Sequence, residues 1–109
     1  MVYLVITSWY PSHKVSDVIK TFTEMLKKYP PSVIGELGEI LVNNAGTSTE
    51  NGLKAMSVYD VKEGKLEEAL KIARSALAMF QPVEGYESKV EVWSTVTESF
   101  EAIGMQAPT

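Results

Sequence analysis

The segment VYLVITSWY at residues 2–10 decides the fold of this 109-residue chain. It is rich in β-branched and aromatic residues, a composition typical of a β-strand. Apolar residues occupy both alternating sets of positions, namely Val2, Leu4 and Ile6 in one set and Tyr3, Val5 and Trp9 in the other. A strand of this kind is covered on both of its faces. The sequence therefore predicts that protein packs against each side of the sheet.

Two helices are predicted from apolar residues that recur three and four positions apart. The first runs from Val15 to Tyr29 and ends before Pro30-Pro31, because proline disfavours a helical conformation in the residue before it. The second opens at Gly64, and its apolar positions continue to Phe80. Both helices have one apolar face, which is expected to pack on the sheet.

Three more strands are predicted, at residues 33–43, 53–61 and 86–97. Gly35 and Gly38 interrupt the first of these, which indicates a bulge or a bend. The polar segment 43–52 is expected to form a long hairpin loop, since it is rich in Asn, Ser and Gly. Residues 99–105 are expected to form a short terminal helix.

The resulting order is strand-helix-strand-strand-helix-strand, in one α+β domain over residues 1–109. Hairpin partners lie side by side, and strand-helix-strand crossovers are right-handed. These rules predict a ferredoxin-like arrangement, which is a four-stranded antiparallel sheet of order 4-1-3-2 with two helices on one face. Two helices leave the second face in water, and soluble monomers rarely expose apolar patches larger than a few hundred Å². A homodimer that packs sheet against sheet is therefore expected, with the same patch used by both copies.

The element order, the strands that are apolar on both faces and the segment EGKLEEAL at residues 63–70 resemble the dimeric α/β-barrel proteins of the ferredoxin-like fold. That superfamily includes stress-responsive barrel proteins, antibiotic-synthesis monooxygenases and muconolactone isomerases. The resemblance covers nearly the whole chain as architecture. It implies a dimeric α/β barrel with a pocket on each sheet, and it assigns no catalytic residue.

Composition and charge argue against several classes of partner. A net charge of −4 and a sequence pI near 5.0 have the wrong sign for binding nucleic acid. No apolar run reaches the roughly 18–20 residues that span a bilayer, so no membrane partner is expected. The N-terminal apolar segment has no basic residues before it, which favours a cytoplasmic protein. With no cysteine and a single histidine, neither a metal nor a cofactor is expected.

Candidate ligand-binding residues lie on the sheet face that points away from the helices. The predicted topology makes the first, third and fourth strands neighbours there, and their residues on this face are Tyr3, Val5, Thr7, Trp9, Met56, Val58, Trp93 and Thr95. Trp and Tyr offer apolar area with one polar group each, and Met fills irregular gaps. Such a wall suits an apolar ligand held by few hydrogen bonds. The same residues are equally suited to form the core of a dimer interface.

His13 is a further candidate ligand-binding residue, and it is the one candidate for acid or base catalysis near neutral pH, because it follows the first strand where pocket-lining loops occur. The alternative is a solvent-exposed residue next to a helix start. Neighbouring serines such as Ser8 and Ser12 are not part of a Gly-x-Ser-x-Gly turn. The carboxylate pairs, Glu36/Glu39, Glu67/Glu68 and Glu98/Glu101, are expected on solvated surface.

Three functions are compatible with this pattern. The first is a small dimeric protein that binds an apolar molecule, either elongated and lipid-like (a fatty acid, for example) or aromatic. The second is a cofactor-free oxygenase or isomerase that acts on an aromatic or polyketide-like substrate, with His13 polarising that substrate. The third is a structural or regulatory dimer without a ligand.

Overall fold

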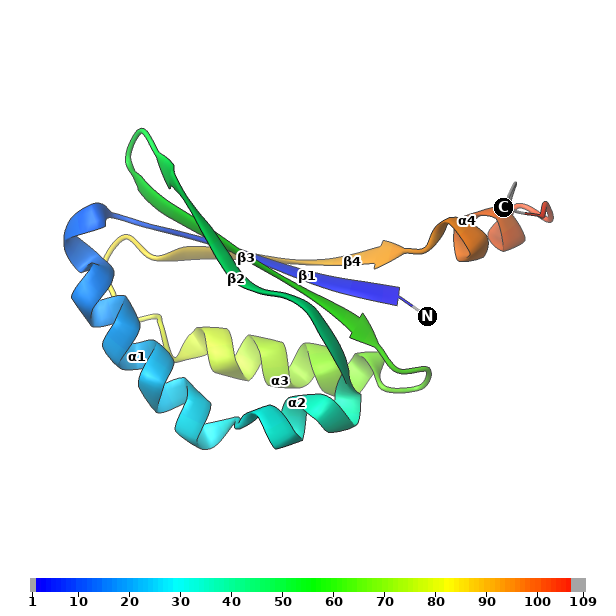
Figure 1. Ribbon diagram of the computed structural model, residues 1–109, viewed down its shortest axis with the longest axis horizontal. Helices are drawn as coiled ribbons and strands as arrows, with labels where there is room; N and C mark the ends of the chain where they lie inside the picture. Colours follow the sequence, from blue (N-terminus) through cyan, green and yellow to red (C-terminus); the bar gives the residue numbers. More distant parts are fainter. Residues whose placement is uncertain (1, 107–109) are drawn as a thin grey trace.

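The computed structural model describes residues 2–106 and has an α+β architecture built on a four-stranded antiparallel sheet. In chain order the elements are β1 Val2–Tyr10, the 3₁₀ turn η1 Ser12–Lys14, α1 Val15–Lys28, α2 Pro31–Leu37, β2 Gly38–Thr49, β3 Gly52–Val61, α3 Leu66–Ala78, β4 Glu87–Ser94 and α4 Val96–Ala102. Three helices, α1, α2 and α3, lie on one face of the sheet, and α4 projects beyond its end (Figure 1). Within residues 2–106, no helix is long and apolar enough to cross a membrane.

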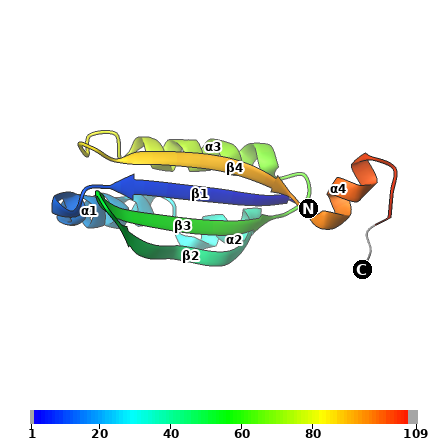
Figure 2. The same cartoon turned by 90° about the horizontal axis from the view of Figure 1, so that it is seen from above.

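The strands are arranged in the order β2-β3-β1-β4, which is the predicted order 4-1-3-2 read from the other edge. The central strand β1 pairs along its length with both β3 and β4, so that Leu4 lies opposite Tyr59 and Val92. Seen from above, α3 runs beneath the β4 side of the sheet and α2 beneath the β2 side (Figure 2). The sheet is open, with β2 and β4 at its two edges.

The predicted strand at residues 33–43 is wrong in its first half, because residues 31–37 form helix α2. Pro31 occupies the first turn of this helix, where its fixed φ suits the helix and its missing N–H breaks no hydrogen bond. Leu37 is buried beneath the sheet. The sequence therefore missed a third helix on this face, where it predicted two.

The predicted polar loop at 43–52 is also wrong, because β2 continues to Thr49 and only Glu50-Asn51 separates it from β3. Strand pairing uses backbone groups, so a polar and exposed segment can form a ladder without an apolar face. Two register shifts, between Ile40 and Val42 and between Val42 and Ala45, bend β2 along β3.

The last strand ends at Ser94, three residues before the predicted end, and α4 begins earlier than the predicted helix at 99–105. Thr95 explains the change, because its side-chain oxygen accepts a hydrogen bond of 3.1 Å from the Glu98 backbone N–H. This contact satisfies an N–H in the first turn of α4, which has no partner within the helix.

The protein is less compact than a typical folded chain of this length. Its radius of gyration is 15.6 Å, whereas about 13 Å is typical for 109 residues. Its accessible surface is 7355 Å², whereas the scaling for a folded monomer of 12.0 kDa gives about 6,000 Å². Part of the surplus is apolar, since Trp93 on β4 is 55% exposed and Ile103 after α4 is 69% exposed.

Candidate functional site

A cavity of about 120 Å³ lies between the sheet and the helices and is partly open to solvent. The sheet contributes alternate residues of β1 and β3, and the helices contribute their apolar faces. The lining residues are Leu4, Ile6, Ser8, Phe22, Met25, Tyr29, Ile34, Leu37, Gly38, Asn44, Ser57, Tyr59, Val61, Ala69, Ile72, Ala73, Ala76, Leu77, Phe80 and Tyr86. The walls are therefore largely aliphatic and aromatic, with hydroxyl and amide groups at a few positions.

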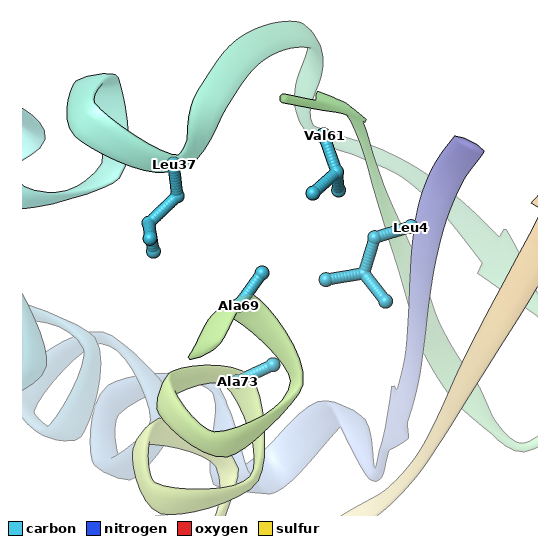
Figure 3. Close-up of a cluster of buried hydrophobic side chains, with 5 residues drawn as sticks. All are labelled: Leu4, Leu37, Val61, Ala69 and Ala73. Atoms are coloured by element: carbon cyan, nitrogen blue, oxygen red, sulfur yellow. The ribbon is translucent and has the colours of Figure 1, made fainter. Parts of the chain in front are cut away.

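One end of the cavity is mainly apolar. There a cluster of buried side chains comes from β1, α2, β3 and α3, namely Leu4, Leu37, Val61, Ala69 and Ala73. These side chains converge on the space between α3 and β1 (Figure 3). Ala69 and Ala73 are four positions apart and face the sheet together. Because both are small, the helix surface leaves room at this position.

The other end of the cavity carries hydrogen-bonding groups. The Tyr86 hydroxyl donates to Ser8 Oγ at 2.8 Å, and the Tyr86 ring stacks on Phe80 with ring centroids 4.6 Å apart. On the neighbouring strand, Ser57 Oγ accepts a 3.0 Å hydrogen bond from the Asn44 backbone N–H. Both serines are buried. The polar groups are thus held in place by hydrogen bonds and by ring stacking.

Two of the three tyrosines that line the cavity, Tyr59 and Tyr86, have a pKa above the ordinary value for a phenol. Burial raises the pKa of Tyr59 above its ordinary value, and a smaller opposing effect comes from its hydrogen bond with Ser57. Burial likewise raises the pKa of Tyr86, which the hydrogen bond with Ser8 lowers by less and the nearby Tyr10 raises further. The Tyr86 proton is taken up by Ser8 Oγ, so at this end of the cavity the Ser8 hydroxyl is the group that can donate its own proton to a ligand.

The sequence-predicted residues lie on the opposite side of the sheet, which we call the outer face. Pairing in register places seven of them on this face, as expected: Tyr3, Val5, Thr7, Trp9, Met56, Val58 and Trp93. Thr95 does not join them, because it follows β4 and caps α4. His13 is exposed on η1, outside the lining of the cavity. Binding of a ligand by these residues stays a prediction.

Sequence reasoning missed the polar end of the cavity, although a signal for it exists. Ser8 is in phase with Leu4 and Ile6, the residues of β1 that face the helices. A serine in a buried apolar series has to find a hydrogen-bond partner, because burying an unpaired hydroxyl costs free energy. Ser57 occupies the corresponding position on β3, opposite Ile6.

Of the described residues that line the cavity, none is charged. Over the described part of the chain, no group of three or more His, Cys, Asp and Glu residues is placed to hold a metal ion. No protein-family model matches the chain, and neither a curated protein nor a solved structure matches it. The resemblance to the dimeric α/β-barrel proteins therefore stays a prediction, and the function is argued from the site itself.

Proposed function

We propose that this protein binds an uncharged, apolar small molecule in the cavity between the sheet and the helices. The observation that carries the proposal is the cavity itself, which is apolar at one end and bears hydroxyl groups at the other. An apolar cavity of roughly 150 Å³ in another protein stays dry and takes up benzene. At about 120 Å³, this cavity is large enough to bury most of one aromatic ring or a short alkyl chain.

The lack of charged groups in the lining selects against ionic ligands. Moving an isolated carboxylate or ammonium group out of water costs many kcal/mol unless a counter-charge accompanies it. The nearest helices carry their charges on other faces, as the exposed Lys71 and Arg74 of α3 illustrate. An alcohol, a ketone or a simple arene is therefore favoured over a fatty-acid anion of the same length.

The polar end gives the ligand an orientation. Ser8 Oγ accepts the proton of Tyr86, and a serine hydroxyl can donate its own proton at the same time. A hydroxyl or carbonyl group on the ligand would meet Ser8 and Tyr86, while its apolar part would extend toward Leu4 and Ala73. Each Å² of apolar surface that the ligand buries contributes about 25 cal/mol.

The test compares 1-butanol, butanoate and butylammonium by calorimetry and ligand-observed NMR at pH 7. We expect 1-butanol to bind and the two ions to bind at least tenfold more weakly. The variant Ala76→Leu fills the cavity and should abolish binding, whereas Ala78→Leu on the exposed side of the same helix should not. Absence of binding by all three compounds would overturn the proposed function, and equal binding of butanoate would overturn only the selection against charge.

The functional unit that we propose is a homodimer of this ferredoxin-like chain, with the outer faces of two sheets packed together as in an α/β barrel. The surplus of surface over that of a typical monomer is roughly 1,300 Å², more than the roughly 800 Å² that each partner buries in a standard interface. The exposed apolar residues Met56 and Trp93 belong to this face. Sedimentation equilibrium at micromolar concentration should give twice the mass of the chain, and a stable monomer would overturn this part of the proposal.

A further inference from the structure

The outer face has a regular pattern that the strand register defines. Its residues form four rows, each of which crosses all four strands from β2 to β4. From the end next to α4 to the end next to the β2–β3 hairpin, the rows are Glu39-Asp60-Tyr3-Trp93, Val42-Val58-Val5-Glu91, Ala45-Met56-Thr7-Lys89 and Thr47-Lys54-Trp9-Glu87. The two middle rows are mainly apolar, and most of the charge lies toward the ends and along β4.

Charge is distributed unevenly between the two ends of this face. The first row has Glu39 and Asp60 directly opposite each other on β2 and β3. Like charges at such a position destabilise a sheet. One carboxylate oxygen of Asp60 is buried and has no hydrogen-bond partner among the described residues. The last row has Lys54, whose ammonium group lies 5.5 Å from the centre of the Trp9 ring. The first row therefore lacks a cation, and the last row holds one.

Two copies that pack face to face are related by a two-fold axis in the plane between the sheets. If the axis runs across the strands, the order of the rows is reversed in the partner and each strand lies over its own copy. Asp60 then faces the partner's Lys54, and the Lys89–Glu91 ion pair of one copy, with its charged atoms 3.5 Å apart, faces the same pair of the other copy. If the axis instead runs along the strands, Asp60 faces the partner's Tyr3 and no pair of opposite charges is formed.

We infer that a second copy of this chain binds the outer face with its two-fold axis across the strands, so that Asp60 pairs with the partner's Lys54. The inference rests on the proposed homodimer and adds its geometry. The two paired rows lie about 10 Å on either side of the axis, given about 3.4 Å per residue along a strand. Stacked sheets twist by about 30° relative to each other, which displaces such rows by about 5 Å. A lysine side chain spans that displacement.

Charge reversal tests the pairing by sedimentation equilibrium. Asp60→Lys and Lys54→Asp, each alone, should raise the dissociation constant of the dimer at least tenfold, because the two-fold axis repeats each unfavourable contact. The double variant should return the dissociation constant to within about threefold of its original value. The control is Glu84→Lys, which reverses the charge of an exposed residue away from this face and should leave the dissociation constant unchanged. If the double variant is no better than the single ones, the pairing is wrong.

Thiol cross-linking tests the axis without reversing a charge, and the absence of native cysteines makes each introduced thiol unique. Stacked sheets lie about 10 Å apart, which is too far for a disulfide, so a short bismaleimide is used to join the two thiols. Mixed Val58→Cys and Met56→Cys chains should be cross-linked into a covalent dimer, because these rows face each other across the proposed axis. Mixed Val58→Cys and Val5→Cys chains should not, although an axis along the strands would favour this pair. Preferential trapping of the second mixture in a dimeric protein would overturn the axis and leave the homodimer intact. A monomeric unmodified protein would overturn both.

Discussion

The two faces of the sheet use the same alternation of residues for different purposes. On the face that the helices cover, Leu4, Ile6 and Ser8 of β1 border a cavity whose described lining is uncharged, and there the Tyr86 hydroxyl pairs with Ser8. On the outer face, Tyr3 and Trp9 lie among charges of both signs, arranged in rows. We propose that the first face selects a small molecule by excluding charge and that the second selects another copy of the chain by matching charge. The two faces of the sheet are both rich in apolar residues, but they differ in where their charged residues lie.

The largest expected effect lies on the helix face. Phe80 is 3% exposed, contacts Val18 and Val83, and stacks on Tyr86. Phe80→Ala should lower the free energy of unfolding by about 3–5 kcal/mol, because it removes a buried ring and leaves a void. Urea denaturation monitored by circular dichroism measures the change.

Glu67 is the control on the exposed side of α3, and Glu67→Ala should change the free energy of unfolding by no more than about 0.5 kcal/mol. Equal losses for Phe80→Ala and Glu67→Ala would mean that the helices do not build the core on this face.

The next effect lies on the outer face. Val58→Asp places an unpaired carboxylate in the middle of the expected interface and should weaken dimerisation by about 2–3 kcal/mol. That corresponds to a roughly 100-fold higher dissociation constant. The control is Ser75→Asp at an exposed position of α3, which should leave the dissociation constant unchanged. Sedimentation velocity over a concentration series distinguishes these results, and an unaffected Val58→Asp dimer would place the interface elsewhere.

A smaller effect concerns the helix at the end of the sheet. Thr95→Ala removes the side-chain cap of α4 and should cost about 1 kcal/mol, confined to that helix. Hydrogen exchange of the α4 amides should become faster, while exchange in β1 should not change. Thr97→Ala, an exposed position inside α4, serves as the matched control, and equal acceleration by both variants would argue against the cap.

The smallest effect is a loss of stability at alkaline pH to which two tyrosines on the face covered by the helices contribute. The pKa values of Tyr59 and Tyr86 are raised in the folded protein, so above about pH 10 the unfolded chain loses protons that the folded chain retains. Their contribution to stability is therefore complete below that pH and declines as the pH rises further. A Tyr59→Phe/Tyr86→Phe double variant should show a shallower decline in chemical denaturation than Tyr3→Phe, whose residue lies on the outer face. Identical slopes would contradict the burial of the two phenols.

The elements with dense periodic patterns were predictable from the sequence. The alternation in β1 and the helical spacing in α1 and α3 match the structure closely. The division of β1 between two faces followed from the same alternation, and pairing with β3 and β4 extended it to Met56 and Trp93.

The parts that were not predictable depend on local chemistry or on distances in space. Residues 31–37 form a helix although Pro30-Pro31 indicates the end of the preceding helix and Gly35 indicates a bend, because proline is well tolerated in the first turn and the segment packs Leu37 under the sheet. The cavity depends on how far α1 and α3 stand from the sheet, which a hydrophobic pattern does not encode. The capping box Thr95-Val96-Thr97-Glu98 was a readable signal for the start of α4.

The open edges of the sheet have a consequence for the behaviour of the protein at high concentration. An edge strand with unpaired backbone groups is a template for fibril growth unless something prevents a further strand from adding. On the β4 edge, Glu87, Lys89 and Glu91 alternate with smaller residues and would repel or misalign an incoming copy. On the β2 edge, the two register shifts bend the strand away from a straight template. Growth by strand addition is therefore disfavoured at both edges, and the chain should remain free of amyloid-like aggregates even where its sheet is exposed.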